Sequence, residues 1–175
     1  KEIGGIYKAL HPRHRLYRGL SEIIPDDNKI FIVNVRQDRI PMDTPSDTHN
    51  VIDDWFESNM PSGIRYRSSS IFCVCSKAVA QTYAVGGNAN AVATILPVGD
   101  YHYCWSPIYN DLFRKIGRNK LSRERIEQII VDGNYKEDTN LVAAIDSTHE
   151  IMLHCKQALV IRSDLTTELY GSVRP

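Results

Sequence analysis

The sequence predicts one α+β domain with a split, mostly antiparallel β-sheet and flanking helices. The chain of 175 residues has the usual length of a single compact domain, and no repeat or linker divides it. Its short apolar runs are rich in β-branched and aromatic residues, as strands are, while other stretches show helical periodicity. Strands and helices do not alternate regularly, which argues against a parallel sheet built from strand–helix–strand units.

The first half of the chain is predicted to combine strands and two helices. The strands, each a run of apolar and β-branched residues, are expected at residues 15–21, 30–35 and 64–74. Residues 48–60 carry large apolar side chains at helical spacing, with Ser46 or Asp47 as the N-cap. Asp53 is assigned to the solvated face of this helix. A shorter helix, capped by Ser76, is expected to run to Tyr83 and to end before two glycines.

The second half is predicted in the same way. Strands are expected at residues 91–98, 101–105, 151–153 and 158–161. Ser106 and Pro107 are expected to open a helix that runs to Ile116, because proline suits the first helical turn. Another helix is expected from Ser122 to Val131, and the polar residues 132–140 are predicted to form a loop.

Charge and hydropathy exclude some classes of function. Lys and Arg total 21 and so do Asp and Glu, so the chain lacks the basic excess that general nucleic-acid binding requires. The basic run at residues 114–125 is interpreted as a solvated surface. No apolar run has the length of a transmembrane helix, and no apolar signal segment is visible. We therefore expect a cytoplasmic monomer with no membrane or nucleic-acid partner.

The four cysteines are predicted to be buried free thiols. Cys73 and Cys75 are one residue apart on an expected strand, which differs from the two-residue spacing typical of structural zinc sites. The alternative zinc set would add Cys104, Cys155, His102 and His154. Unpaired cysteine commonly packs as a small hydrophobe, and this interpretation fits a reducing compartment and no bound metal.

Three segments, far apart in the chain, place chemically useful side chains in strand-like sequence. They are Leu16-Tyr17-Arg18-Gly19, then Arg67-Ser68-Ser69-Ser70-Ile71-Phe72-Cys73 with the following Ser76 to Tyr83, and last His149-Glu150-Ile151-Met152-Leu153. Arginine donates bidentate, permanently charged hydrogen bonds to phosphate, and glycine allows close approach of the backbone to a ligand. Aromatic rings stack on planar heterocycles, and a carboxylate stabilises the cation that forms when a glycosidic bond breaks. Taken singly, each segment also has an ordinary structural interpretation.

In this order, the three segments resemble the NAD-binding core of the ADP-ribosyltransferase superfamily. The resemblance covers roughly residues 15–162 and implies NAD as co-substrate. It implies that Arg18 and Gly19 hold the dinucleotide and that Ser69 or Ser70 lines the ribose pocket. It further implies that Phe72 and Tyr83 stack on nicotinamide. Arg18 and Glu150 would be the catalytic residues, with Glu150 stabilising the ribosyl cation.

One position departs from the pattern of the superfamily. Arginine-modifying members have Glu, and several other members Gln, two residues before the catalytic glutamate, where this chain has Thr148. The resemblance therefore implies a hydroxyl acceptor or water, with Thr148 and His149 beside the acceptor and His149 able to deprotonate it. Bacterial effectors that modify a threonine of host ubiquitin are similar in this respect. This similarity implies a toxin delivered into the cytosol of a host cell, with ubiquitin as the acceptor.

Two other functions fit the same residues. An NAD glycohydrolase would use water as the acceptor and release free ADP-ribose. A non-catalytic binding domain of the same fold would instead use Tyr103 and Trp105, which alternate on one strand, as an exposed partner surface.

Overall fold

The structure, a computed structural model, describes residues 15–40, 43–118 and 120–165. It confirms the predicted α+β class with a mostly antiparallel sheet, since all strand pairs are antiparallel. The strands run in the order β1-β4-β6-β2, with β3 on β6 and β5 on β4. Their bounds are Tyr17–Gly19 (β1), Ile30–Asn34 (β2), Ser70–Cys73 (β3), Val92–Trp105 (β4), Lys136–Glu137 (β5) and Ile151–Arg162 (β6).

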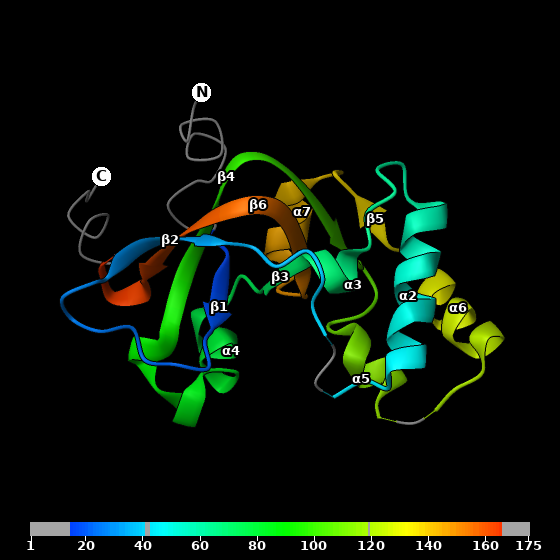
Figure 1. Cartoon of the computed structure of the whole chain (residues 1–175), viewed down its shortest axis with the longest axis horizontal. Helices are drawn as coiled ribbons and strands as arrows, with labels where there is room; N and C mark the ends of the chain where they lie inside the picture. Colours follow the sequence, from blue (N-terminus) through cyan, green and yellow to red (C-terminus); the bar gives the residue numbers. More distant parts are fainter. Residues whose placement is uncertain (1–14, 41–42, 119, 166–175) are drawn as a thin grey trace.

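The sheet curls until two of its edges meet (Figure 1). β4 and β6 form the long central pair, which bends where the register of β4 shifts between Val98 and Tyr101. One edge strand, β1, pairs with the first half of β4, and β3 pairs with the first half of β6. Tyr17 then bridges Val74, the residue directly after β3, which closes a ring of β1, β4, β6 and β3. This ring places the first and second chemical segments side by side.

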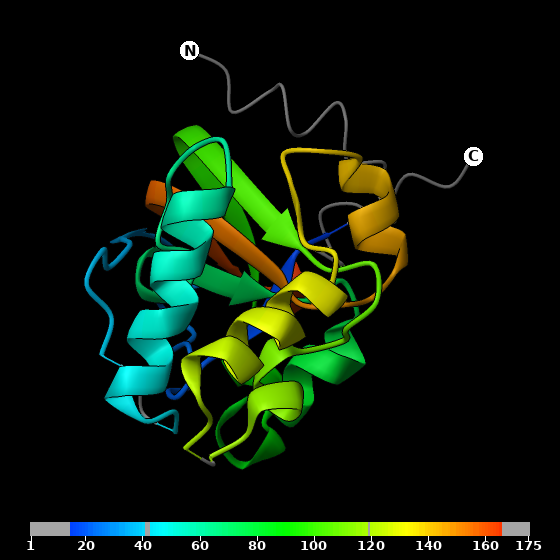
Figure 2. The same ribbon diagram turned by 90° about the vertical axis from the view of Figure 1, so that its right-hand side faces the viewer.

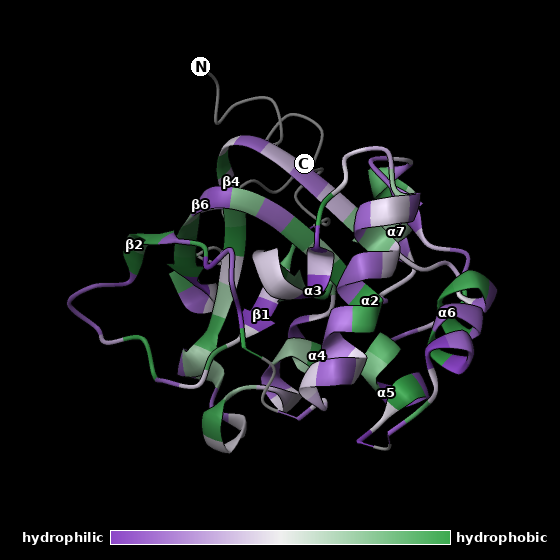
Figure 3. Cartoon of the chain, turned by 45° about the vertical axis from the view of Figure 1, so that its right-hand side comes forward, coloured by the Kyte–Doolittle hydropathy of each residue, from purple (hydrophilic) through white to green (hydrophobic). Residues whose placement is uncertain are grey.

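Helices cover the outside of this sheet. Their bounds are Ser46–Asn59 (α2), Tyr66–Ser69 (α3), Lys77–Thr82 (α4), Leu112–Ile116 (α5), Arg123–Asp132 (α6) and Leu141–Asp146 (α7), with short 3-10 turns at Val85–Gly87 and Ala89–Ala91. α2, α5 and α6 form one layer, which faces the viewer in Figure 2. Figure 3 shows the mixed polar and apolar surface of α2 expected for an amphipathic helix.

Alternate residues of the central strands serve two cores. Cys104 and Met152 pack with Phe56, Tyr66 and the apolar side of α6. Their neighbours along the strands point to the opposite face and pack with α7, as alternation in a strand requires. Tyr103 and Trp105 belong to this second core and are 7% and 6% exposed, so the interpretation of these rings as an exposed partner surface is wrong.

Several predicted boundaries differ from the structure. Residues 66–69 form the helical turn α3 instead of strand, and β3 begins only at Ser70. The two runs predicted at residues 91–98 and 101–105 form one strand, Val92–Trp105, because Gly99, with φ of 82°, allows a bulge between them. The short runs at 151–153 and 158–161 are likewise one strand. The helix predicted to open at Ser106 begins at Leu112, where Asp111 caps it.

Among the described residues, no helix combines the length and the apolar character needed to cross a membrane.

Candidate active-site cleft

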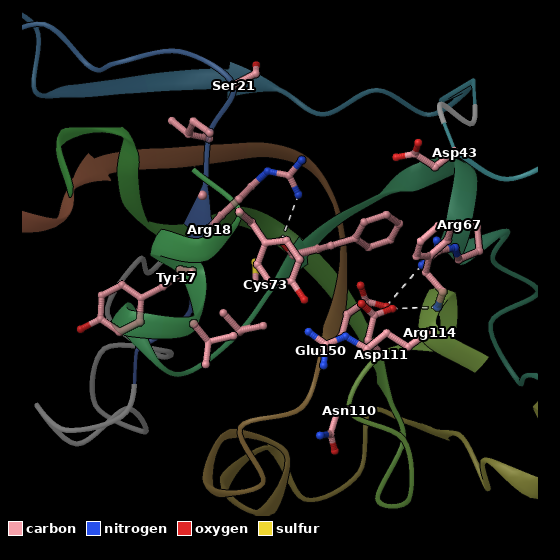
Figure 4. Close-up of a pocket in the computed structure, with 18 of the residues that line it drawn as sticks. Tyr17, Arg18, Ser21, Asp43, Arg67, Cys73, Asn110, Asp111, Arg114 and Glu150 are labelled. Carbon is pink, nitrogen blue, oxygen red and sulfur yellow. Dashed lines mark hydrogen bonds and ion pairs between the residues drawn. The ribbon is translucent and has the colours of Figure 1, made fainter. Parts of the chain in front are cut away.

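The three chemical segments meet at a cleft of about 580 Å³ (Figure 4). This volume lies within the range of about 300–1,000 Å³ typical of small-molecule sites. β1, β3 and α4 form one side of the cleft, and α3, the segment before α5 and the turn before β6 form the other. The residues from the predicted set that line it are Arg18, Gly19, Phe72, Tyr83, Thr148 and Glu150.

Arg18 is held at the cleft by the ring closure of the sheet. Its backbone pairs with β4, opposite Ala93, while its side chain crosses to β3. There Nη1 donates a hydrogen bond of 3.0 Å to the carbonyl oxygen of Phe72. The guanidinium has five N–H donors in a planar fork, so this bond fixes the side chain without using its whole donor set.

Glu150 lies on the opposite wall in a poorly solvated position. Its side chain is 18% exposed, and its Oε1 lies 3.3 Å from Nη1 of Arg67. Burial raises the pKa of Glu150 and Asp111 adds to the rise, while the positive charges of Arg67, Arg39 and Arg18 act against it. The net shift is upward, so the charged carboxylate is under-stabilised in this cleft. A positive charge formed on a ligand there would be favourable to it.

The Phe72 ring lies against two guanidinium groups. The Cζ atom of Arg39 is 4.5 Å from the ring centroid and that of Arg67 is 4.4 Å away, both within cation–π distance. Burial, together with the nearby positive charges of Arg18 and Arg67, lowers the pKa of Arg39 to about 10. The crowding of the guanidinium groups of Arg18, Arg39 and Arg67 in one cleft favours an anionic ligand such as a diphosphate.

A buried aspartate fixes the position of Arg67. Asp53 of α2 is fully buried, and its Oδ1 accepts a hydrogen bond of 2.8 Å from the backbone N–H of Arg67. Its Oδ2 accepts from the hydroxyl of Ser68 and lies 3.3 Å from Nε2 of His49. Burial opposes the charge on Asp53, yet the hydrogen bonds from His49, Ser68 and the Arg67 backbone outweigh it and lower the pKa. The assignment of Asp53 to the solvated face is therefore wrong.

This anchor explains why residues 66–69 leave the extended conformation. Both hydrogen bonds to Asp53 come from consecutive residues of α3, which a helical turn can direct to one carboxylate. The turn also aims the Arg67 side chain at Glu150. Sequence pattern indicated a strand here, because a four-residue turn has no periodicity of its own.

Three predicted residues lie away from the cleft lining. The Ser69 hydroxyl donates to the carbonyl oxygen of Arg65 at 2.9 Å and lies 2.9 Å from Nδ1 of His154. The Ser70 hydroxyl is buried without a hydrogen-bond partner in the described part of the chain. Nδ1 of His149 lies 2.7 Å from the carbonyl oxygen of Ser106, so the ring is engaged with the backbone. The predicted pocket roles of these three side chains have no support from the cleft geometry.

Gly19 and Tyr83 contribute through the packing of α4. A Cβ atom on Gly19 would lie 2.3 Å from the carbonyl oxygen of Ala80, so the absence of a side chain lets β1 pack directly on α4. Gly19 lines the cleft, but this close packing, rather than the approach of a ligand, is what demands glycine there. Tyr83 ends α4 and is 52% exposed at the edge of the cleft.

Arg39 and Asp111 are among the cleft residues that were not assigned a role from the sequence. Arg39 follows β2 in an irregular segment, where no pattern shows which side chain points to a ligand. Asp111 also lines the cleft, and its short helix gives no sequence signal beyond the cap itself. Both are brought to the site by tertiary structure alone.

All four cysteines are free thiols, and burial raises the pKa of Cys75 to about 12 and that of Cys155 to about 11. Within residues 15–40, 43–118 and 120–165, no group of three His, Cys, Asp or Glu side chains is arranged to hold a metal ion.

Comparison with protein-family models, with curated proteins and with solved structures finds no match to this chain.

Proposed function

We propose that the protein is an NAD-dependent mono-ADP-ribosyltransferase that transfers ADP-ribose to a hydroxyl-bearing side chain of a target protein. The observation that carries the proposal is the convergence of Arg18, Phe72 and Glu150 on one cleft. These residues come from three distant segments and supply the phosphate ligand, the stacking ring and the carboxylate that NAD cleavage needs.

The charges of the cleft support a dinucleotide as the ligand. Arg18 and Arg39 lie on the side where the diphosphate would bind, with Phe72 between them and Glu150. The exposed ring of Tyr83 offers an apolar face to the nicotinamide, and Phe72, whose ring lies against Arg39 and Arg67, lines the same cleft. In this arrangement the phosphates neutralise the crowded guanidinium groups, and the nicotinamide ribose faces the carboxylate.

The step that follows is cleavage of the bond between the ribose C1′ and the nicotinamide nitrogen. The electron pair of this bond leaves with nicotinamide, and the ribose gains positive charge. Glu150 stabilises that charge, because its carboxylate is poorly solvated and gains more from a cation than it would in water. Arg67 holds the carboxylate in place until the cation forms.

The proposal is tested by incubating NAD, labelled in the ADP-ribose part, with a cell lysate and with purified ubiquitin. Glu150→Gln is compared with the wild type, and Glu57→Gln serves as a matched control. Glu57 also pairs with an arginine, Arg65, at 2.7 Å, but it lies outside the cleft. We expect labelled protein with the wild type and Glu57→Gln, and a loss of about 100-fold or more with Glu150→Gln.

Each outcome has a distinct meaning. Equal labelling by the wild type and Glu150→Gln would remove Glu150 from catalysis. Free ADP-ribose without labelled protein would identify an NAD glycohydrolase. Calorimetry that detects no NAD binding up to millimolar concentration would identify a non-catalytic binding domain.

A further inference from the structure

A second carboxylate, that of Asp111, shares the cleft with Glu150. Asp111 lies in the segment between β4 and α5, and its Oδ1 caps α5 by accepting a hydrogen bond of 2.7 Å from the backbone N–H of Phe113. The backbone N–H of Glu150 donates to the carbonyl oxygen of Asn110 at 2.9 Å, which fixes Asp111 next to Glu150. Figure 4 shows both side chains in the same part of the cleft.

The two carboxylates interact but have different surroundings. The negative charge of Asp111 contributes to the raised pKa of Glu150. Glu150 has Arg67 of α3 as its ion-pair partner, and Arg39 and Arg18 also act on its charge. No ion pair to Asp111 occurs within the described residues, so one of its oxygens caps the helix and the other is not committed to a cation. The carboxylates of Glu150 and Asp111 therefore differ in their surroundings, since Glu150 is paired with a cation and one oxygen of Asp111 is not.

A hydroxyl acceptor must lose its proton when it attacks the ribose, and other side chains near the cleft are poorly placed to take it. His149 does not line the cleft and is engaged with the carbonyl oxygen of Ser106. His49 lines the cleft, but its Nε2 contacts Asp53 and the Ser68 hydroxyl. The carboxylate of Asp43 pairs with Arg118 at 3.0 Å. This leaves Asp111 as the base with access to the acceptor.

We propose that Asp111 is the general base of the transfer reaction and accepts the proton of the acceptor hydroxyl. This inference rests on the proposed function. The acceptor oxygen forms a bond to C1′ of the ribose as the bond from C1′ to nicotinamide breaks, and nicotinamide leaves as a neutral molecule. The hydroxyl proton moves to the Asp111 carboxylate and then to solvent. Glu150 keeps its charge throughout and stabilises the ribosyl cation.

The test uses Asp111→Asn in the full chain. Asparagine is as good an N-cap as aspartate, so α5 and the fold are expected to be kept, which melting temperature checks. The probes are NAD with water and NAD with methanol, and the measured quantity is nicotinamide release by chromatography. We expect the rate to fall by about 100-fold or more, in line with loss of a general base, while the Kd for NAD stays within about twofold.

Rescue by azide distinguishes between two roles of Asp111: a general base, and a residue that only holds the cleft in shape. Azide is a nucleophile with no proton to lose, so it needs no base and should restore nicotinamide release by Asp111→Asn, with azido-ADP-ribose as the product. Azide should not restore Glu150→Gln, which lacks the group that stabilises the cation. Glu57→Gln, which removes a carboxylate charge outside the cleft, is expected to keep the wild-type rate within about twofold.

The inference fails if Asp111→Asn keeps the wild-type rate, if azide does not restore it, or if the variant loses NAD binding. A wild type that neither binds nor cleaves NAD would overturn the proposed function instead, and the role of Asp111 with it. The two failures are therefore distinguishable.

Discussion

At the scale of single residues, the cleft contains a glutamate whose charge is costly to the fold. Because the pKa of Glu150 is raised in the folded state by burial, the protonated form is favoured by folding. This contribution is fully present below the pKa of the unfolded chain and is lost as the pH rises through the folded pKa. At neutral pH the wild type therefore carries an unfavourable charge that function requires.

Glu150→Gln is expected to raise the melting temperature at pH 7 to 8, since glutamine keeps the shape of the side chain and removes the costly charge. This rise in melting temperature should shrink as the pH falls below the ordinary pKa of a glutamate, because the side chain at position 150 is then neutral in both the wild type and the variant. Differential scanning fluorimetry across pH 3 to 8 measures it. Glu57→Gln, at an exposed ion pair, should change little. A lower melting temperature for Glu150→Gln at pH 8 would contradict this account.

The pH dependence of activity should report the same group. Glu150 must be charged to stabilise a cation, so nicotinamide release should fall as the pH drops through its raised pKa. Arg67→Gln removes the nearest positive charge, which raises this pKa further and moves the acid limb of kcat/KM to higher pH. Arg65→Gln, which removes a guanidinium that pairs with the exposed Asp54 and Glu57, should leave the limb unchanged. If the acid limb of kcat/KM lies at the same pH in Arg67→Gln as in the wild type, Glu150 is not the group that this limb reports.

At the scale of elements, the junction of α2 with α3 depends on Asp53. Asp53→Ala leaves the Arg67 N–H, the Ser68 hydroxyl and His49 without their partner in a buried place. We expect a loss of about 3 kcal/mol in the free energy of unfolding, measured by urea denaturation. Asp54→Ala, one residue away, removes only exposed pairs with Arg65 and Arg123 and should cost less than about 1 kcal/mol. Equal losses in the free energy of unfolding from the two substitutions would show that the buried carboxylate of Asp53 stabilises the fold no more than the exposed carboxylate of Asp54.

The same elements show what sequence pattern can and cannot predict. The helices at α2 and α6 were predicted, because helical periodicity is a local property of the chain, but α2 is preceded by Pro45 as N-cap and not by Ser46 or Asp47. The merging of two short runs into β4 was not, because Gly99 allows both a turn and a bulge, and only the pairing with β6 selects the bulge. Asp53 was misplaced because nothing in the local sequence distinguishes it from an exposed helix carboxylate, and two of its partners, Arg67 and Ser68, lie 14 and 15 residues away.

At the scale of the whole molecule, the candidate site was partly predictable, because some of its residues stand out in the local sequence and others do not. Arg18 and Glu150 stood out as charged residues beside apolar, strand-like sequence, and Phe72 stood out as part of the segment with three serines; the structure brings all three to one cleft. Arg39 and Asp111 did not stand out, because each lies in irregular or short structure whose place is set by the rest of the fold. The predicted choice between Ser69 and Ser70 gains no support, because the Ser69 hydroxyl donates to the carbonyl oxygen of Arg65 and the Ser70 hydroxyl is buried at the start of β3.

The bridge between Tyr17 and Val74 has a consequence for how the cleft opens and closes. Its two backbone hydrogen bonds, of 2.7 and 2.8 Å, join β1 to the residue that follows β3, whereas β4 and β6 are paired along most of their length. Arg18 and Phe72 lie next to this bridge, so breaking the bridge would move the Arg18 guanidinium away from the carbonyl oxygen of Phe72. Amide hydrogen exchange at Tyr17 and Val74 would thus report transient loss of the cleft long before the central strands unfold.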